Sequence, residues 1–179
     1  MTKTAKTYGG ALYDLAQEEN LTGEILNDLS LVTQIFRDTP SYRKLLCEPS
    51  ISKDERKSLL DEAWRGRVHP YTLNFLKLLC DNGTIGQITD CAGEYRLRYN
   101  EDNDILPVRA VSASALTDAQ SARLRAILQK KTGKQIDLTV SVDETLLGGM
   151  RLSYAGNQYD GTVRHHLEEI GKLLQNTVL

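Results

Sequence analysis

The stretch LLGGMRLSYAGNQYDGTVR, from Leu146 to Arg164, is the most distinctive part of this chain. It opens with Gly148-Gly149, and Ala155-Gly156-Asn157 supplies turn residues between two short strand-like pieces. Asp160 then stands where an N-cap carboxylate could accept the backbone N–H groups two and three residues further on. We therefore predict a hairpin that leads into a capped helix. Because the stretch holds no plausible catalytic group, it favours a docking module.

The residues around this stretch complete a small α/β module. Residues 108–111 are short and strand-like, and a capping box at residues 116–120 precedes a helix that ends at Gly133. Residues 138–142 alternate apolar and polar side chains, which is the two-residue period of a half-buried strand. A last helix is expected to bury Val163, Leu167, Ile170 and Leu174. The predicted order is β-α-β-β-α.

The first hundred residues instead predict six short helices. Apolar side chains recur with the helical period, as in the stripe of Ile25, Leu29, Val32 and Phe36. The expected helix ends are marked by Thr4, Thr39-Pro40, a capping box at residues 52–55, Pro70, and Asn82-Gly83. A sixth helix is expected from about Ile85 toward Asn100. The fold class is therefore α+β, with a six-helix bundle over residues 1–105 and the β-α-β-β-α module over residues 106–179.

The composition is that of a soluble globular protein, with 40% hydrophobic and 26% charged residues among 179. The net charge is −2, which disfavours a nucleic-acid binder because such domains are usually basic. Residues 1–105 carry 13 Lys and Arg against 17 Asp and Glu, whereas residues 106–179 carry 9 against 7. This shift in charge supports a domain boundary near Leu106-Pro107.

No signal peptide or membrane span is expected. The first residues lack an apolar h-region, and no window approaches about 18 consecutive apolar residues. We expect a cytoplasmic protein without direct membrane insertion, and a peripheral role on a membrane stays open.

No catalytic, cofactor or metal site is expected either. Cys47, Cys80 and Cys91 lack CxxC spacing, and we expect them to be reduced and mostly buried. The adjacent His165-His166 would point about 100° apart on a helix and could not share one ion. Gly148-Gly149 lacks the surrounding pattern of a phosphate-binding loop, and no serine has GxSxG context. The sequence therefore does not predict an enzyme.

The fifth predicted helix is apolar around most of its circumference, through Tyr71, Leu73, Phe75, Leu76, Leu78, Leu79 and Cys80. A helix that is apolar on all sides must be covered on all sides. It could be the central helix of the bundle. Alternatively, one face is left for a partner, and a groove between this helix and the first would accept an amphipathic helix from another chain.

Essentially the whole chain resembles the delta-subunit family of bacterial F-type ATP synthases, which is related to the mitochondrial oligomycin-sensitivity-conferring protein. Family members look like "vDpsLiGGvvvrvgd.viDgSvrgrLe.L", and residues 142–167 are similar to this pattern. The matching signature residues are Gly148, Gly149, Asp160, Gly161, Arg164 and Leu167. Further similarities are residues 8–12 to "YAkAL", residues 78–83 to "lL..ngR" and residues 111–117 to "VtSA.pLs".

The chain departs from the family pattern at several positions. Threonine replaces serine at Thr162, and positive charge is absent at Thr84 and at His165-His166. Gly9-Gly10 replaces Ala-Lys and weakens the first helix by roughly 1 kcal/mol per glycine relative to alanine. Close packing, or ordering of the helix by a partner, could recover part of that cost.

The resemblance implies a non-catalytic stalk protein without a cofactor. Residues 1–105 would cap the F1 catalytic head, and residues 106–179 would join it to the b subunits of the peripheral stalk, at the cytoplasmic face of the bacterial cell membrane. Helices one and five would form the groove that receives the N-terminal helix of an alpha subunit. Carried onto this chain, the groove residues are Tyr8, Ala11, Leu12, Leu15, Phe75, Leu78 and Leu79.

The alternative from another class is a helical RNA-binding or antitermination-type module. Such a module would need a face rich in Lys and Arg, and residues 1–105 are net negative. A third alternative is a small enzyme, but the sequence contains no group of residues in a catalytic pattern that would support it.

Overall fold

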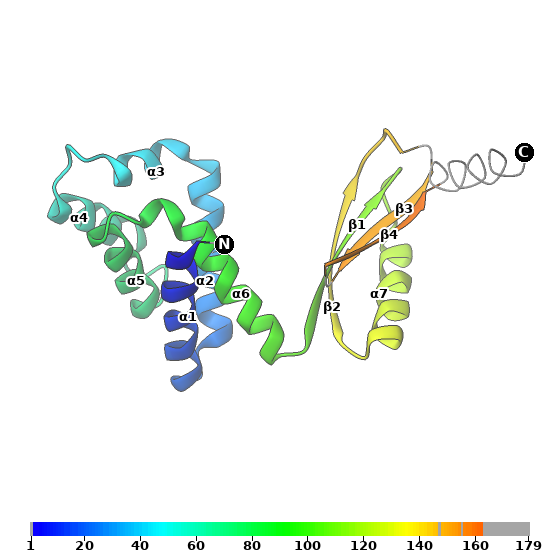
Figure 1. Cartoon of the computed structure of the whole chain (residues 1–179). Coiled ribbons are helices and arrows are strands. Elements are labelled where there is room, and N and C mark those ends of the chain that lie inside the picture. Colours follow the sequence, from blue (N-terminus) through cyan, green and yellow to red (C-terminus); the bar gives the residue numbers. More distant parts are fainter. Residues whose placement is uncertain (1, 147, 155, 163–179) are drawn as a thin grey trace, which may run out of the picture. The chain divides into compact units, whose positions relative to one another are not determined.

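The chain divides into two compact units, Met1–Tyr99 and Asn100–Leu179. The computed structural model describes residues 2–146, 148–154 and 156–162. Across these residues it has seven α-helices and one four-stranded sheet, so the α+β class is confirmed (Figure 1). The division between the units lies inside the last helix of the first unit, N-terminal to the predicted boundary at 105/106.

The regular elements of the first unit, within its described residues, are helices, apart from an isolated bridge between Arg65 and Val68. Its elements are α1 (Lys3–Glu18), α2 (Thr22–Asp38), α3 (Pro40–Cys47), α4 (Lys53–Trp64), α5 (Pro70–Asp81), the 3-10 turn η1 (Ile85–Gln87) and α6 (Ile88–Asp102). The sixth predicted helix therefore opens with a short 3-10 turn at Ile85 and continues as α6, two residues past the expected end at Asn100.

Local capping interactions explain most of the helix ends. In the capping box of α4, the Ser52 hydroxyl accepts from the backbone N–H of Glu55, whose carboxylate accepts from the N–H of Ser52. The prediction at the start of α1 was wrong. Thr2 caps this helix, because its Oγ1 accepts from the N–H of Ala5, whereas Thr4 lies in the first turn. At the end of α5, Gly83 has φ +67°, which glycine adopts without a steric penalty.

The core of the first unit is mainly aliphatic and is centred on α2, α5 and α6. Ile25, Leu29, Leu76 and Leu79 are almost completely buried. Tyr95 is also fully buried and meets Tyr13 edge to face, with the ring centroids 5.1 Å apart. On α5, the buried side chains are Thr72, Leu73, Phe75, Leu76, Leu79 and Cys80. This helix is therefore a core helix, as the first of the two interpretations expected, although one of its faces stays open.

The second unit is built on a mixed sheet. Its described elements are β1 (Ile105–Ser112), α7 (Asp118–Thr132), β2 (Gln135–Val142), β3 (Gly149–Tyr154) and β4 (Asn157–Thr162). The strand order is β2-β1-β3-β4, in which β1 and β2 are parallel while β3 is antiparallel to both β1 and β4. The connection between the two parallel strands runs through α7, as expected for a crossover of this kind.

A small apolar core lies between α7 and one face of this sheet. Val108, Leu128 and Ile136 are buried there, and Leu124 and Leu152 pack against them. The capping box of α7 is present, since Thr117 and Gln120 bond each other reciprocally. The predicted strand, helix and strand of residues 108–142 are confirmed, with strands longer than expected.

The prediction of a helix cap at Asp160 was wrong. Asp160 lies in β4 opposite Arg151 of β3, and Arg151 Nε donates to Asp160 Oδ2 at 3.1 Å. The two strands pair from Gly149 opposite Thr162 to Tyr154 opposite Asn157, and Gly156 between them has φ +76°. The carboxylate therefore bonds across the hairpin, and the backbone there is extended.

Some of the other signature residues lie within the described residues and some lie outside them. Gly149 pairs with Thr162, Gly161 pairs with Met150, and Gly148 directly precedes β3. Arg164, Leu167 and the predicted last helix lie outside the described residues. The predicted β-α-β-β-α order is thus β-α-β-β-β up to Thr162, because the predicted hairpin contributes two strands.

Candidate functional site

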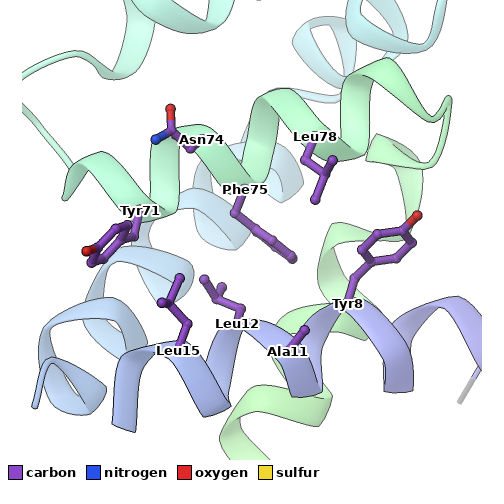
Figure 2. A pocket seen from close by; sticks show the side chains of 8 residues that line it. All are labelled: Tyr8, Ala11, Leu12, Leu15, Tyr71, Asn74, Phe75 and Leu78. Carbon is purple, nitrogen blue, oxygen red and sulfur yellow. The ribbon is translucent and has the colours of Figure 1, made fainter. Parts of the chain in front are cut away.

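A cavity of about 430 Å³ lies between α1 and α5. Phe75 points from α5 toward α1, while Leu12 and Leu15 point from α1 toward α5 (Figure 2). The complete lining is Tyr8, Ala11, Leu12, Leu15, Tyr71, Asn74, Phe75 and Leu78. We call this feature the α1–α5 groove.

Six of the seven residues carried over for partner binding line this groove. They are Tyr8, Ala11, Leu12, Leu15, Phe75 and Leu78. The seventh, Leu79, is 0% exposed and belongs to the core. Leu78 and Leu79 are neighbours on a helix, so they point about 100° apart, and only Leu78 reaches the groove.

Two lining residues, Tyr71 and Asn74, were not among those carried over. Together with Phe75 and Leu78 they follow the spacing i, i+3, i+4, i+7, which places all four on one face of α5. The same spacing relates Tyr8, Ala11, Leu12 and Leu15 on α1. Helical spacing, counted back from Leu78, was therefore a signal that could have found both residues.

The groove has a buried floor and an exposed apolar rim. Leu12 and Phe75 are only 4% and 6% exposed, whereas Leu15 and Leu78 are 36% and 47% exposed. Exposed leucines that stand singly on a surface are common, but these two flank one concave apolar cavity. Covering them would remove apolar surface from water, which favours binding of an apolar partner.

Polar contacts fix the position of α5. Asp28 of α2 accepts two hydrogen bonds through Oδ2, from the backbone N–H of His69 at 2.7 Å and from Thr72 Oγ1 at 2.9 Å. His69 is the N-cap, and its Nδ1 accepts from the N–H of Tyr71. The exposed donors at the start of α5 are thus satisfied by side chains, as helix termini require.

Two ion pairs join α5 to α4. Lys77 Nζ lies 2.7 Å from Asp61 Oδ1, and Lys57 Nζ lies 2.9 Å from Asp81 Oδ1. The hydrogen bond from Lys77, aided by that from Arg65, lowers the pKa of Asp61. The hydrogen bond to Asp81 likewise raises the pKa of Lys57. Both shifts favour the charged forms, so the pairs are formed at neutral pH.

A second cavity, of about 220 Å³, lies among α2, α3 and α4. It is lined by Ile35, Thr39, Tyr42, Ala63, Trp64 and Arg67. Trp64 Nε1 donates to the Tyr42 hydroxyl at 3.2 Å, and burial raises the pKa of that tyrosine. The cavity is about half the size of the α1–α5 groove.

The cysteines show no sign of a reactive site. All three are free, and Cys80 and Cys91 are buried as predicted, whereas Cys47 is exposed. Burial raises the pKa of the Cys91 thiol to about 11, so the thiol is protonated at neutral pH and is a poor nucleophile.

Residues 2–146, 148–154 and 156–162 contain neither a metal-binding cluster nor a membrane-spanning helix. Within these ranges, no group of three or more His, Cys, Asp or Glu side chains could hold a metal ion. The helices of the same ranges are too short or too polar to cross a membrane.

Comparison with known proteins gives a consistent result. The family model for the ATP synthase delta (OSCP) subunit matches residues 4–174. The ATP synthase subunit delta of Alkaliphilus oremlandii is 32% identical over 174 residues, which are 95% of this chain and 97% of the relative. That of Shouchella clausii is 29% identical over 171 residues, covering 95% of this chain and 94% of the relative.

A solved structure shares the fold. A chain in the cryo-EM structure of the Toxoplasma gondii mitochondrial ATP synthase hexamer superposes with a TM-score of 0.77. The match covers 97% of this chain and 98% of that chain at 20% sequence identity.

Proposed function

The chain belongs to the ATP synthase delta (OSCP) subunit family, and from this premise we propose that the α1–α5 groove binds the N-terminal helix of an alpha subunit. Membership of the family makes the chain a non-catalytic component of the peripheral stalk of an F-type ATP synthase. The groove would then be the contact through which the first unit holds the F1 catalytic head.

The observation that carries this proposal is the apolar lining of the groove. Both walls are helices, and the rim residues Leu15 and Leu78 are exposed beside the buried Leu12 and Phe75. An amphipathic helix binds such a groove by laying its apolar face between the two walls, with anchors spaced i, i+3, i+4 and i+7. The walls present the same spacing, so side chains of the two surfaces can interdigitate.

Polar groups at the edges of the groove would orient the bound helix. The hydroxyl of Tyr8 is held by Asn82, and the exposed Asn74 stands on the opposite wall from Ala11. A few placed polar groups around an apolar site fix orientation while the apolar area supplies most of the affinity.

The mechanical task of a stalk contact sets what the groove must achieve. The peripheral stalk holds the catalytic head still against the torque of the rotor, so the dissociation rate under load is the relevant quantity. Differences in affinity between related interfaces lie mostly in the dissociation rate. Burial of Leu15 and Leu78 under a partner helix would therefore act chiefly by slowing release.

We further propose that residues 106–179 bind the b subunits of the stalk. The chain would then link the F1 head to the membrane sector from the cytoplasmic face of the bacterial membrane, as a peripheral protein. Two attachments through one chain convert the second binding event into an intramolecular one, and the effective concentration can reach millimolar values. Loss of either attachment would weaken the whole assembly.

The test measures how much F1 catalytic head stays bound to membranes when this chain carries Leu78→Asp or Ala11→Asp. A buried carboxylate without a partner is costly, so we expect both variants to release heads while far-UV circular dichroism stays unchanged. Leu97→Asp is the matched control, because Leu97 of α6 is 48% exposed, as Leu78 is 47%, and it does not line the groove. Normal head retention by folded Leu78→Asp would contradict the proposal.

A further inference from the structure

Two adjacent glycines lie on α1 outside the face that lines the groove. Gly9 and Gly10 are both buried, although they lie in the middle of a helix, where glycine is unfavourable. They follow Tyr8 by rotations of about 100° and 200°, whereas Leu12 and Leu15 lie within about 40° of Tyr8. Gly10 therefore lies nearly opposite the groove-lining face of α1, and Gly9 lies beside that face, about 60° beyond Leu12.

Gly9 lets the backbone of α1 approach the backbone of α6. A methyl group added at Gly9 would lie 2.5 Å from the carbonyl oxygen of Cys91 and 3.1 Å from Cβ of Glu94. Ordinary contacts of this kind begin at 3.4 Å. Because the nearest atom belongs to the backbone of a buried helical turn, it cannot rotate away. An alanine at this position would have to move α1 outward by roughly 1 Å.

Gly10 has a different neighbour. A methyl group there would meet the guanidinium of Arg98, which is the far end of a long side chain. Arg98 Nη1 lies 2.9 Å from Asp14 Oδ1 and Nε lies 3.3 Å from Oε1 of the buried Glu94, so the guanidinium passes over α1 at this glycine. Arg98 can rearrange, and the helix backbone at Gly10 need not move.

We propose that Gly9 is a positioning residue for the α1–α5 groove. Its contact with Cys91 sets the distance of α1 from α6, and this distance in turn sets where the groove-lining face of α1 stands relative to α5. Moving α1 away from α6 would carry Tyr8, Leu12 and Leu15 with it and would change the width of the groove. This inference rests on the proposed function, because the proposed function supplies the partner helix whose fit depends on that width.

The same contact explains why the chain keeps a glycine that costs helix stability. Interiors are packed as densely as organic crystals and transmit strain, so a displacement of α1 at Gly9 would also displace the groove-lining residues of the same helix. Gly10 shares the helical penalty but lacks the rigid contact. The two glycines therefore form a matched pair, in which only Gly9 should control the groove.

The experiment uses the full-length chain and a synthetic peptide of about 20 N-terminal residues of the alpha subunit from the same organism. Isothermal titration calorimetry gives the affinity for Gly9→Ala, for Gly10→Ala, and for Gly93→Ala, which adds a methyl group in open space on α6. We expect Gly9→Ala to weaken binding by about tenfold and the other two variants to stay within about twofold of the wild type. In the free protein, the methyl NMR signals of Leu78 on α5 should shift in Gly9→Ala and not in Gly10→Ala.

Each result has a defined meaning. Unchanged affinity of folded Gly9→Ala, or an equal loss in Gly10→Ala, would overturn the positioning role while leaving the proposed function intact. Absence of peptide binding by the wild type would overturn the proposed function and this role together. If Gly9→Ala does not fold, Arg98→Ala decides. Arg98→Ala removes the ion pairs of Arg98 with Asp14 and Glu94 and keeps the contact between Gly9 and Cys91. Near-normal peptide binding by this variant would support the role of Gly9, and a tenfold loss of affinity would contradict it.

Discussion

The side-chain amide of Asn82 donates a hydrogen bond to the hydroxyl of Tyr8 across 3.2 Å. Tyr8 lies on α1 and Asn82 is the C-cap of α5, so this bond joins the two walls of the groove at one end. At the far end of the groove, within the described residues, no such hydrogen bond joins Leu15 of α1 to Tyr71 of α5. The groove is therefore closed at Tyr8 by a polar contact and stays apolar along the rest of its length.

Tyr8→Phe should loosen this end of the groove. It removes one exposed hydrogen bond, so we expect the free energy of unfolding in urea to fall by about 0.5–1 kcal/mol. Tyr71→Phe is the control, because the structure assigns no hydrogen bond to the Tyr71 hydroxyl within the described residues, and it should leave stability unchanged. An equal loss in both variants would show that removal of a tyrosine hydroxyl in general, and not the bond to Asn82, is responsible.

Asp28→Ala should destabilise the first unit by about 2 kcal/mol. The carboxylate of Asp28 accepts both the N–H of His69 and the hydroxyl of Thr72, and removal of a helix-capping acceptor costs about 1 kcal/mol while a second hydrogen bond adds a similar amount. Urea denaturation followed by circular dichroism measures the change. Asp28→Asn keeps an acceptor oxygen, so it should lose less. A larger loss in the asparagine variant would contradict this explanation.

Acid stability should depend on Asp61. The hydrogen bond from Lys77 lowers the pKa of Asp61 below 3.8 in the folded chain. A lowered carboxyl pKa means that the contribution to stability is present above the unfolded pKa and is lost as the pH falls through the folded one. Asp61→Asn should therefore be less stable than the wild type at pH 7, and the two unfolding curves should converge below pH 3.8.

Salt and a neighbouring residue provide the controls for Asp61. The difference at pH 7 should shrink at 1 M salt, where the Debye length is about 3 Å. Glu62 is the next residue on α4 and has no ion pair within the part of the chain that the structure describes, so Glu62→Gln should leave the loss of stability at acid pH unchanged. A difference in stability between the wild type and Asp61→Asn that persists at low pH would indicate that packing, and not charge, is responsible.

The sequence allowed the helices to be predicted from spacing, whereas the groove residues were carried over from the family resemblance. The period of Ile25, Leu29, Val32 and Phe36 fixes which face of α2 is buried, and all four side chains are buried. The capping boxes depend on residues three apart in the chain, so they could be located without a tertiary structure.

The errors arose where a tertiary contact decides between two local options. Asp160 suits a helix cap or a strand, and its partner Arg151 becomes visible only once the hairpin register is known. Leu79 could not be separated from Leu78, because α5 is apolar on nearly every side. The role of Gly9 depends on Cys91, which is 82 positions away in the chain, and no periodicity links two such residues.

The most direct test of the central claim is an NMR titration of the full-length chain with the alpha N-terminal peptide. If the α1–α5 groove is the binding site, the largest chemical-shift changes will fall on the methyl signals of Leu15 and Leu78 and on the ring signals of Tyr8 and Tyr71, which line both walls. Leu97, which is equally exposed outside the groove, will stay unperturbed. Saturable binding with its largest shifts away from the groove, or no binding at all, would contradict the account.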